Sequence, residues 1–276
     1  MIAVDEVQNQ ALLAFDSIAA SYDDLFTRSM IGRAQRGVVW DALLDTFEPG
    51  AHILELNCGT GEDALFLARH DISVVACDGS EGMIRTARKR QQQEDPDAPI
   101  HFKLLPTEQL AELHPGHSFD GVLSNFSGLN CVSHLDPVVW NIASLVTPGA
   151  SALICLSTRF CLAETLWFLL HGDFPKAFRR TPGVADAKVS EFTVKVHYPT
   201  LRQVKQSFSP WFRLRSCTGI GVAVPPSYLE PMIRKYPRLL GLLRWIDKRI
   251  SRLPLLRIMG DHMLLHFERV ECGRCY

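Results

Sequence analysis

Strand-like and helix-like segments alternate along the first half of this chain, and this alternation restricts the fold more than any other feature. Segments with helical periodicity and a polar face separate short, mostly apolar segments. Because each helix carries the chain back to the start of the next strand, successive strands run parallel. The pattern predicts an open α/β fold with a mostly parallel sheet. The candidate strands are 52–58, 73–78, 100–105, 119–125 and 151–157.

Two later strand candidates, 212–221 and 261–270, extend the predicted sheet to seven strands. Residues 159–211 form an insertion after the fifth strand, and residues 222–259 form another after the sixth. Long connections in compact domains are usually functional. Open α/β sheets bind ligands outside the carboxyl ends of their strands. We therefore expect one domain over residues 1–276, with both insertions covering the acceptor end of a site.

The charge balance excludes some classes of protein. The chain has 29 Lys+Arg against 30 Asp+Glu, so no overall positive charge favours nucleic acid binding. The first ten residues lack a secretory signal, and no uninterrupted apolar span is present, which predicts a cytoplasmic location. The eight cysteines are then expected to be reduced. Cys272 and Cys275 have metal-ligand spacing without a second pair, so no metal site is expected.

The segment from Ile53 to Ala64, ILELNCGTGEDA, is a strand that runs into a glycine turn and then a helix. Gly59 and Gly61 remove side chains where a ligand would otherwise collide with the chain. The following helix presents free backbone N–H groups. About twenty residues later Asp78 ends the second strand, where a carboxylate can accept hydrogen bonds from ribose hydroxyls.

Two cofactors compete for this turn. Its glycine spacing matches the dinucleotide fingerprint, in which a pyrophosphate lies at the helix N-terminus. However, the carboxylates of Glu55, Glu62 and Asp63 surround the turn and would repel a pyrophosphate. A sulfonium with an amino-acid tail fits better, because Glu55 can attract its ammonium group directly or through water.

These motifs resemble those of the class I S-adenosylmethionine-dependent methyltransferases, in the branch that acts on small molecules. ILELNCGTGEDALFLA resembles the glycine-rich first motif of that family, and ACDGSEGMI resembles its acidic second motif. FDSIAASYD, LLPTEQL and FDGVLSNFSGLNCV resemble the lead-in, the adenine-side segment and the fourth-strand segment. The resemblance covers residues 15–157 and, more weakly, the closing strand GDHMLLHFERV.

The resemblance implies a Rossmann-like doubly wound fold, S-adenosylmethionine as cofactor and a small-molecule acceptor. Asn57 stands where the family usually has a glycine, and Asn tolerates the left-handed conformation. Pro106 stands where an Asp often contacts the adenine, so that contact passes to a neighbour. An NAD(P)-dependent oxidoreductase and a catalytically silent S-adenosylmethionine-binding adaptor are the alternatives. The implied cofactor residues are Tyr22, Glu55, Asn57, Gly59, Gly61, Asp78, Gly79, Met83, Thr107, Glu108, Asn125 and Phe126.

Methyl transfer to a hydroxyl or an acidic carbon also needs a base. His134 follows the fourth strand, and His197 ends an alternating run over 191–197, so these two are the catalytic candidates. Asn125-Phe126-Ser127-Gly128 replaces the Asn-Pro-Pro-Tyr-like segment of nucleic-base methyltransferases. We therefore expect a small acceptor, apolar or amphiphilic, and no nucleic acid partner.

Residues 233–258 hold eight basic residues and one acid, Asp247. Leucines and isoleucines recur here at spacings of three and four, which predicts an amphipathic helix with an apolar stripe. Two interpretations stay open: a helix that covers the pocket with its apolar side, or peripheral contact with an anionic membrane surface. The predicted stripe is Leu239, Leu243, Ile246, Ile250 and Leu253, and the predicted basic face is Arg244, Lys248 and Arg252.

Overall fold

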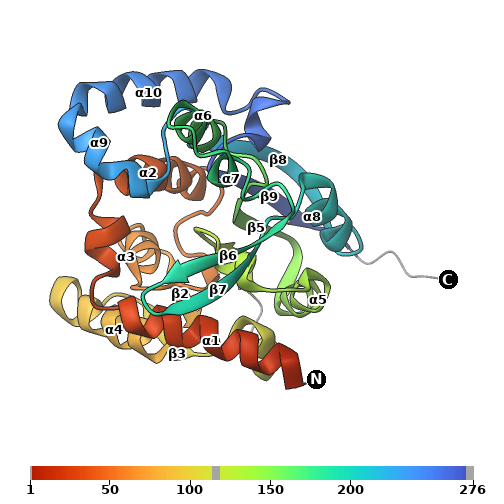
Figure 1. Cartoon of the computed structure of the whole chain (residues 1–276). Helices are drawn as coiled ribbons and strands as arrows, with labels where there is room; N and C mark the ends of the chain where they lie inside the picture. The colour runs from red at the N-terminus through yellow and green to blue at the C-terminus, as the bar shows by residue number, and fades with distance from the viewer. Residues whose placement is uncertain (1, 114–118, 272–276) are drawn as a thin grey trace.

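A seven-stranded sheet forms the centre of the molecule (Figure 1), in a computed structural model that describes residues 2–113 and 119–271. Its strands are β1 (His52–Leu56), β2 (Ser73–Asp78), β3 (Ile100–Leu104), β4 (Phe119–Ser124), β5 (Val146–Ser157), β8 (Phe212–Ile220) and β9 (His262–Arg269). Their order is β3-β2-β1-β4-β5-β9-β8. β1 to β5 pair in parallel, and β9 is antiparallel to both neighbours. The predicted α/β, mostly parallel sheet is confirmed.

Helices cover both faces of this sheet. The first five are α1 (Ile2–Ile18), α2 (Met30–Leu44), α3 (Glu62–Ala68), α4 (Glu81–Glu94) and α5 (Leu135–Leu145). Alternate β1 residues enter two different cores, because successive strand side chains point to opposite faces. Ile53 packs with residues of α2, α3 and α4, whereas Leu54 packs with residues of α5. This arrangement leaves the carboxyl ends of the parallel strands open between the two layers.

The chain caps its helices largely where the sequence predicts. The Ser80 hydroxyl accepts a 3.1 Å hydrogen bond from the backbone N–H of Met83, so Ser80 is the N-cap of α4. α5 differs from expectation, since it begins at Leu135 and Pro137 lies within its first turn rather than at the first position.

The insertion after β5 contains α6 (Leu162–Leu170), α7 (Phe174–Ala177), a hairpin of β6 (Val184–Val189) and β7 (Phe192–His197), and α8 (Leu201–Phe208). The sequence did not predict the hairpin, although the alternation over 191–197 belongs to β7. Among the strands that the structure describes, β6 and β7 pair only with each other. Figure 1 shows the hairpin beside α1, against which both strands pack.

The insertion after β8 contains two short 3₁₀ turns, η4 (Ser227–Leu229) and η5 (Leu256–Ile258), and between them α9 (Glu230–Lys235) and α10 (Pro237–Ile250). The two carboxylate oxygens of Glu230 accept hydrogen bonds of 2.9 and 3.0 Å from the first N–H groups of α2, which joins α9 to α2. α10 is shorter than the predicted stripe, and Leu253 lies beyond its end with 48% of its surface exposed. Within the described part of the chain, no helix has the length and apolar content needed to cross a bilayer.

Candidate active site

The glycine turn after β1 is built on left-handed backbone. Asn57 has φ of 54°, Gly59 54° and Gly61 75°. Asn57 thus adopts the left-handed conformation, which asparagine tolerates better than most residues. A Cβ at Gly59 would point into open space, whereas a Cβ at Gly61 would lie 2.8 Å from the ring of Phe102. Gly59 therefore leaves room for a ligand, and Gly61 lets α3 pack closely against the sheet.

Asp78 joins two turns at the end of β2. One carboxylate oxygen accepts a 2.9 Å hydrogen bond from the N–H of Gly59, and the other accepts a 2.8 Å bond from the N–H of Ser80. Burial raises the pKa of Asp78, and the backbone N–H groups oppose that shift. The carboxylate is thus held rigidly beside the glycine turn.

These turns form the floor of a cavity of about 370 Å³ at the carboxyl ends of β1, β2 and β4. Most residues that the sequence proposed as cofactor contacts line it, although they come from five separate segments of the chain. They are Tyr22, Asn57, Gly59, Asp78, Gly79, Met83, Thr107, Glu108 and Phe126. This cavity is called the cofactor cavity below.

Three proposed cofactor residues do not line the cavity: Glu55, Gly61 and Asn125. Glu55 lies beneath the turn with 1% of its surface exposed, and its Oε2 has no hydrogen-bond partner. Burial, followed by the charge of Asp63, raises the pKa of Glu55 well above its ordinary value. A buried acidic group therefore lies below the glycine turn, and one of its oxygens has no hydrogen-bond partner among the described residues.

Asp63 is the centre of a buried polar network behind the cavity. It accepts hydrogen bonds from Arg36 at 2.5 Å, from the indole N–H of Trp40 at 2.7 Å and from the Asn125 amide at 2.8 Å. The Arg36 guanidinium also lies 4.9 Å from the centre of the Phe126 ring. Asp63 is therefore neutralised by Arg36, and Asn125 fixes the chain after β4 rather than contacting the cavity.

An acidic side chain lies beside the glycine turn. Asp23 accepts a 2.7 Å hydrogen bond from the Thr60 hydroxyl and forms an ion pair with Arg90. A dinucleotide pyrophosphate would bring further negative charge to this turn, and the N–H of Gly59 already donates to Asp78. The site therefore disfavours a dinucleotide.

The roof of the cofactor cavity is apolar and comes from segments that the sequence did not assign to the site. The hairpin contributes one face of its two strands, and α1 contributes part of its last three turns. The sequence does contain a signal for these two strands, because apolar and polar residues alternate over 184–189 and over 191–197. The roof residues are Ala187, Val189, Val194 and Val196 of the hairpin and Ala11, Leu12 and Phe15 of α1.

The two candidate bases lie elsewhere. His134 and His197 line a second cavity of about 760 Å³, and neither lines the cofactor cavity. Burial lowers the pKa of His197, followed by the charges of Lys195 and His134. The amide of Asn130 holds this strand end through a 2.5 Å hydrogen bond to the carbonyl of His197. Val132 lines both cavities, so they adjoin there.

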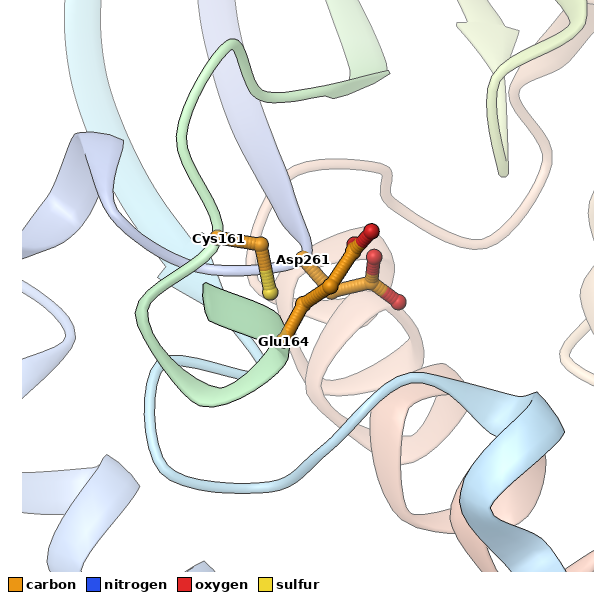
Figure 2. A group of neighbouring side chains, drawn as sticks. All are labelled: Cys161, Glu164 and Asp261. Carbon is orange, nitrogen blue, oxygen red and sulfur yellow. The ribbon is translucent and has the colours of Figure 1, made fainter. Parts of the chain in front are cut away.

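A metal-type cluster lies away from both cavities. Figure 2 shows Cys161, Glu164 and Asp261 converging, each with one ligand atom within 4.8 Å of the others. Arg180 forms ion pairs with both carboxylates. Burial by itself raises the pKa of Asp261, but the charges of His262 and Arg180 outweigh burial and lower this pKa below its ordinary value. The cluster is therefore an ion-pair network that ties the first insertion to the start of β9. Cys272 and Cys275 lie outside the described residues.

Comparison with known proteins identifies a domain around the cofactor cavity. Residues 53–149, which hold the glycine turn and Asp78, match the model of the methyltransferase domain family. This part of the chain is therefore a methyltransferase domain, and its fold is that of the class I S-adenosylmethionine-dependent methyltransferases. The chain is 32% identical over 149 residues to a demethylmenaquinone methyltransferase of Symbiobacterium thermophilum, covering 51% of this chain and 56% of that relative. It is 33% identical over 132 residues to an uncharacterised methyltransferase of Mycobacterium bovis, covering 47% and 64%. The chain thus spans a little over half the length of the first curated relatives it matches.

Solved structures share the fold of this chain. An S-adenosylmethionine-dependent methyltransferase from Mesorhizobium loti has a TM-score of 0.56 at 15% identity, covering 85% of this chain and 98% of that one. A phosphoethanolamine N-methyltransferase of Haemonchus contortus, solved with S-adenosylhomocysteine, has a TM-score of 0.57 at 17% identity, covering 93% and 57%.

The residues around the cofactor cavity fit S-adenosylmethionine, the cofactor of class I methyltransferases. Glu55 Oε2 and Asn57 Oδ1 are buried acceptors without partners, and a cationic amino-acid tail supplies donors. The open space at Gly59 leaves room for the ligand. The net acidic floor suits a sulfonium better than a phosphate.

Proposed function

We propose that this protein transfers the methyl group of S-adenosylmethionine to a small apolar or amphiphilic acceptor. One observation carries the proposal: the same cavity has a polar, acidic floor of cofactor-type residues and an apolar roof made by α1 and the β6–β7 hairpin. A cavity of this kind matches an ionic cofactor on one side with an apolar molecule on the other.

The floor residues would bind and orient the cofactor. Asp78 would accept hydrogen bonds from ribose hydroxyls, since its carboxylate is fixed by two backbone N–H groups. Glu55 and Asn57 would take up the ammonium end, and Thr107 and Glu108 would face the adenine. When bound, S-adenosylmethionine supplies an electrophilic methyl group on a sulfonium, so the protein contributes mainly alignment and exclusion of water.

The acceptor is proposed from the hairpin and from the relatives together. The hairpin presents only alanine and valine side chains to the cavity, which favours apolar rings or chains over charged molecules. The relatives named demethylmenaquinone methyltransferases are consistent with this class, because demethylmenaquinone is an apolar quinone. An acceptor hydroxyl or acidic carbon must also lose its proton.

Proton removal remains assigned to His197 or His134, with the acceptor reaching the second cavity past Val132. Burial lowers the pKa of His197, so its imidazole is neutral at neutral pH, as a base requires. The two insertions would then serve as the cover of the acceptor site, although in the described residues only the first lines the cofactor cavity.

A labelled-methyl assay tests the proposal. The intact protein would be given S-adenosylmethionine with a labelled methyl group and either a short-chain naphthoquinol or a polar catechol acid of similar ring chemistry. We expect label to enter the naphthoquinol preferentially. Transfer to neither acceptor, together with cofactor binding, would favour a silent adaptor. NAD(P)-dependent oxidation without methyl transfer would favour the oxidoreductase.

Two hairpin variants locate the acceptor. Val196 faces the cofactor cavity, whereas Thr193 lies on the exposed face of the same strand. Val196→Ser should raise KM for an apolar acceptor by roughly tenfold, because burying a valine side chain is worth about 1.5 to 3 kcal/mol. Thr193→Ala should leave KM unchanged. Equal effects of the two substitutions on KM would show that the acceptor does not contact this face of the hairpin.

A further inference from the structure

The outward side of α10 carries large, exposed side chains. Arg238, Leu242, Trp245 and Arg249 follow one another at spacings of four, three and four, so they form one stripe along the helix. Leu242 is 54% exposed and Trp245 53%. The guanidinium of Arg249 lies 3.5 Å from the centre of the Trp245 ring. This side differs from the half-buried Leu239 and Leu243, which pack against the core.

Exposed apolar side chains continue from α10 into the next segment of the chain. Leu253, Leu255 and Ile258 follow the helix, and Leu255 is 76% exposed. The N–H of Leu162, at the start of α6, bonds to the carbonyl of Met259 at 2.9 Å, which brings α6 beside this segment. Figure 1 shows α6 and α10 on the same side of the molecule. The α10 face is defined here as Leu242, Trp245, Leu253, Leu255 and Ile258, with Leu166 and Leu170 of α6.

The positive charge around the α10 face is only partly balanced by acids, since Asp41 and Asp45 lie in one groove with Arg244, Lys248 and Arg252. The one acid of this segment, Asp247, is buried and accepts hydrogen bonds from the N–H groups of Ala223 at 2.6 Å and Val224 at 3.3 Å. Among the residues that the structure describes, no carboxylate forms an ion pair with six exposed basic residues around the face. They are Lys235, Arg238, Arg244, Lys248, Arg249 and Arg252.

The structure also changes which basic residues flank the apolar ones. The sequence grouped Arg244, Lys248 and Arg252 as the basic face. These three basic residues line a groove between α10 and α2. Asp41 and Asp45 line the same groove. Arg238 and Arg249 instead stand at the two ends of the outward stripe and flank Leu242 and Trp245.

We propose that the α10 face binds an anionic phospholipid surface. Exposed leucines and a tryptophan flanked by arginines suit the boundary between headgroups and acyl chains, where the apolar side chains enter and the guanidiniums contact phosphates. Nucleic acid would use the charges but leave the aliphatic side chains exposed to water. This inference does not depend on the proposed function.

Vesicle flotation with the full-length protein tests the inference. The probes are vesicles of phosphatidylcholine with about 30% phosphatidylglycerol and vesicles of phosphatidylcholine alone. We expect binding to the anionic vesicles that weakens with added salt. Leu242→Gln with Trp245→Gln, and separately Arg238→Gln with Arg249→Gln, should each weaken this binding at least roughly tenfold.

Matched controls use exposed residues on other helices. Trp140→Gln changes a tryptophan on α5 that is 55% exposed, and Arg85→Gln with Lys89→Gln removes two exposed charges from α4. Both controls should bind like the unchanged protein. Wild-type protein that stays in solution with anionic vesicles would overturn the inference. So would equal loss of binding in the controls, or light scattering that shows a dimer dependent on Trp245 without vesicle binding.

Discussion

Asp16, near the end of α1, accepts a 2.7 Å hydrogen bond from the backbone N–H of Gly82, in the first turn of α4. The same carboxylate oxygen accepts a hydrogen bond from the Ser80 hydroxyl. A Cβ at Gly82 would lie 3.1 Å from this oxygen, so glycine allows the close approach. Since Leu12 and Phe15 of α1 form part of the cavity roof, one carboxylate attaches the roof to the floor.

Asp16→Ala should loosen α1 and weaken cofactor binding roughly tenfold, because hydrogen bonds to a charged group are worth about 1.5 to 3 kcal/mol. Asp16→Asn retains an acceptor oxygen and should restore much of the affinity. Asp24→Ala, which removes an exposed carboxylate, is the control. The measurement is calorimetric titration with S-adenosylhomocysteine. Unchanged affinity in Asp16→Ala would show that α1 does not hold the cavity closed.

Removing the charge of Asp63 should destabilise the fold. Asp63→Asn leaves the buried guanidinium of Arg36 without its charged partner, and such changes cost about 3 to 5 kcal/mol. Asp24→Asn breaks an exposed pair and should change the free energy of unfolding by less than about 1 kcal/mol. Urea denaturation measures both. Similar losses in the two variants would contradict a central role for the Asp63 network.

Glu55 should link protons to cofactor binding. Its raised pKa means that the folded protein retains a proton that the unfolded chain releases above its ordinary pKa. This contribution to stability is present at low pH and is lost as pH rises. Glu55→Gln should therefore retain stability above pH 4.5 better than the unchanged protein.

A cationic ligand should displace this proton. Titrations of S-adenosylmethionine in buffers of different ionisation enthalpy should show proton release by the unchanged protein and none by Glu55→Gln. The same number of protons in both proteins would place the ammonium group away from Glu55.

His197 should behave as a neutral base. Because burial lowers its pKa, the folded protein binds fewer protons than the unfolded chain near pH 6.5, and His197 weakens the fold as pH falls below that value. His197→Gln should lower kcat at least roughly a hundredfold and spare cofactor affinity. His134→Gln tests the other candidate, and exposed His171→Gln is the control. Full activity in both variants would show that the acceptor needs no histidine base.

The sequence predicted the floor of the cavity well because its determinants are local. The left-handed Asn57, at φ of 54°, and the N-cap Ser80 each follow from the residue type and its immediate neighbours. Asp78 could be placed because strand ends in parallel βαβ units meet at one edge of the sheet.

The roof and the charge balance could not be predicted, since they depend on contacts between distant segments. The hairpin pairs only with itself, and nothing in its alternation indicates that it crosses the cavity beside α1. By sequence, Asp63 is one of the carboxylates expected to repel a pyrophosphate, but Arg36, 27 residues earlier, neutralises it. The basic segment was treated as one helix, whereas α9 and α10 meet at Tyr236, which alters the residues that face outward.

Calorimetric titration of the purified protein with S-adenosylhomocysteine, and separately with NAD⁺, tests the central claim most directly. The account predicts that S-adenosylhomocysteine binds at one site per chain and that NAD⁺ does not. In Asp78→Asn the affinity should fall at least tenfold, since the variant loses charge-assisted hydrogen bonds worth about 1.5 to 3 kcal/mol. Asp97→Asn, at an exposed loop, should bind normally. Binding of NAD⁺ without S-adenosylhomocysteine, or unchanged affinity in folded Asp78→Asn, would contradict the account.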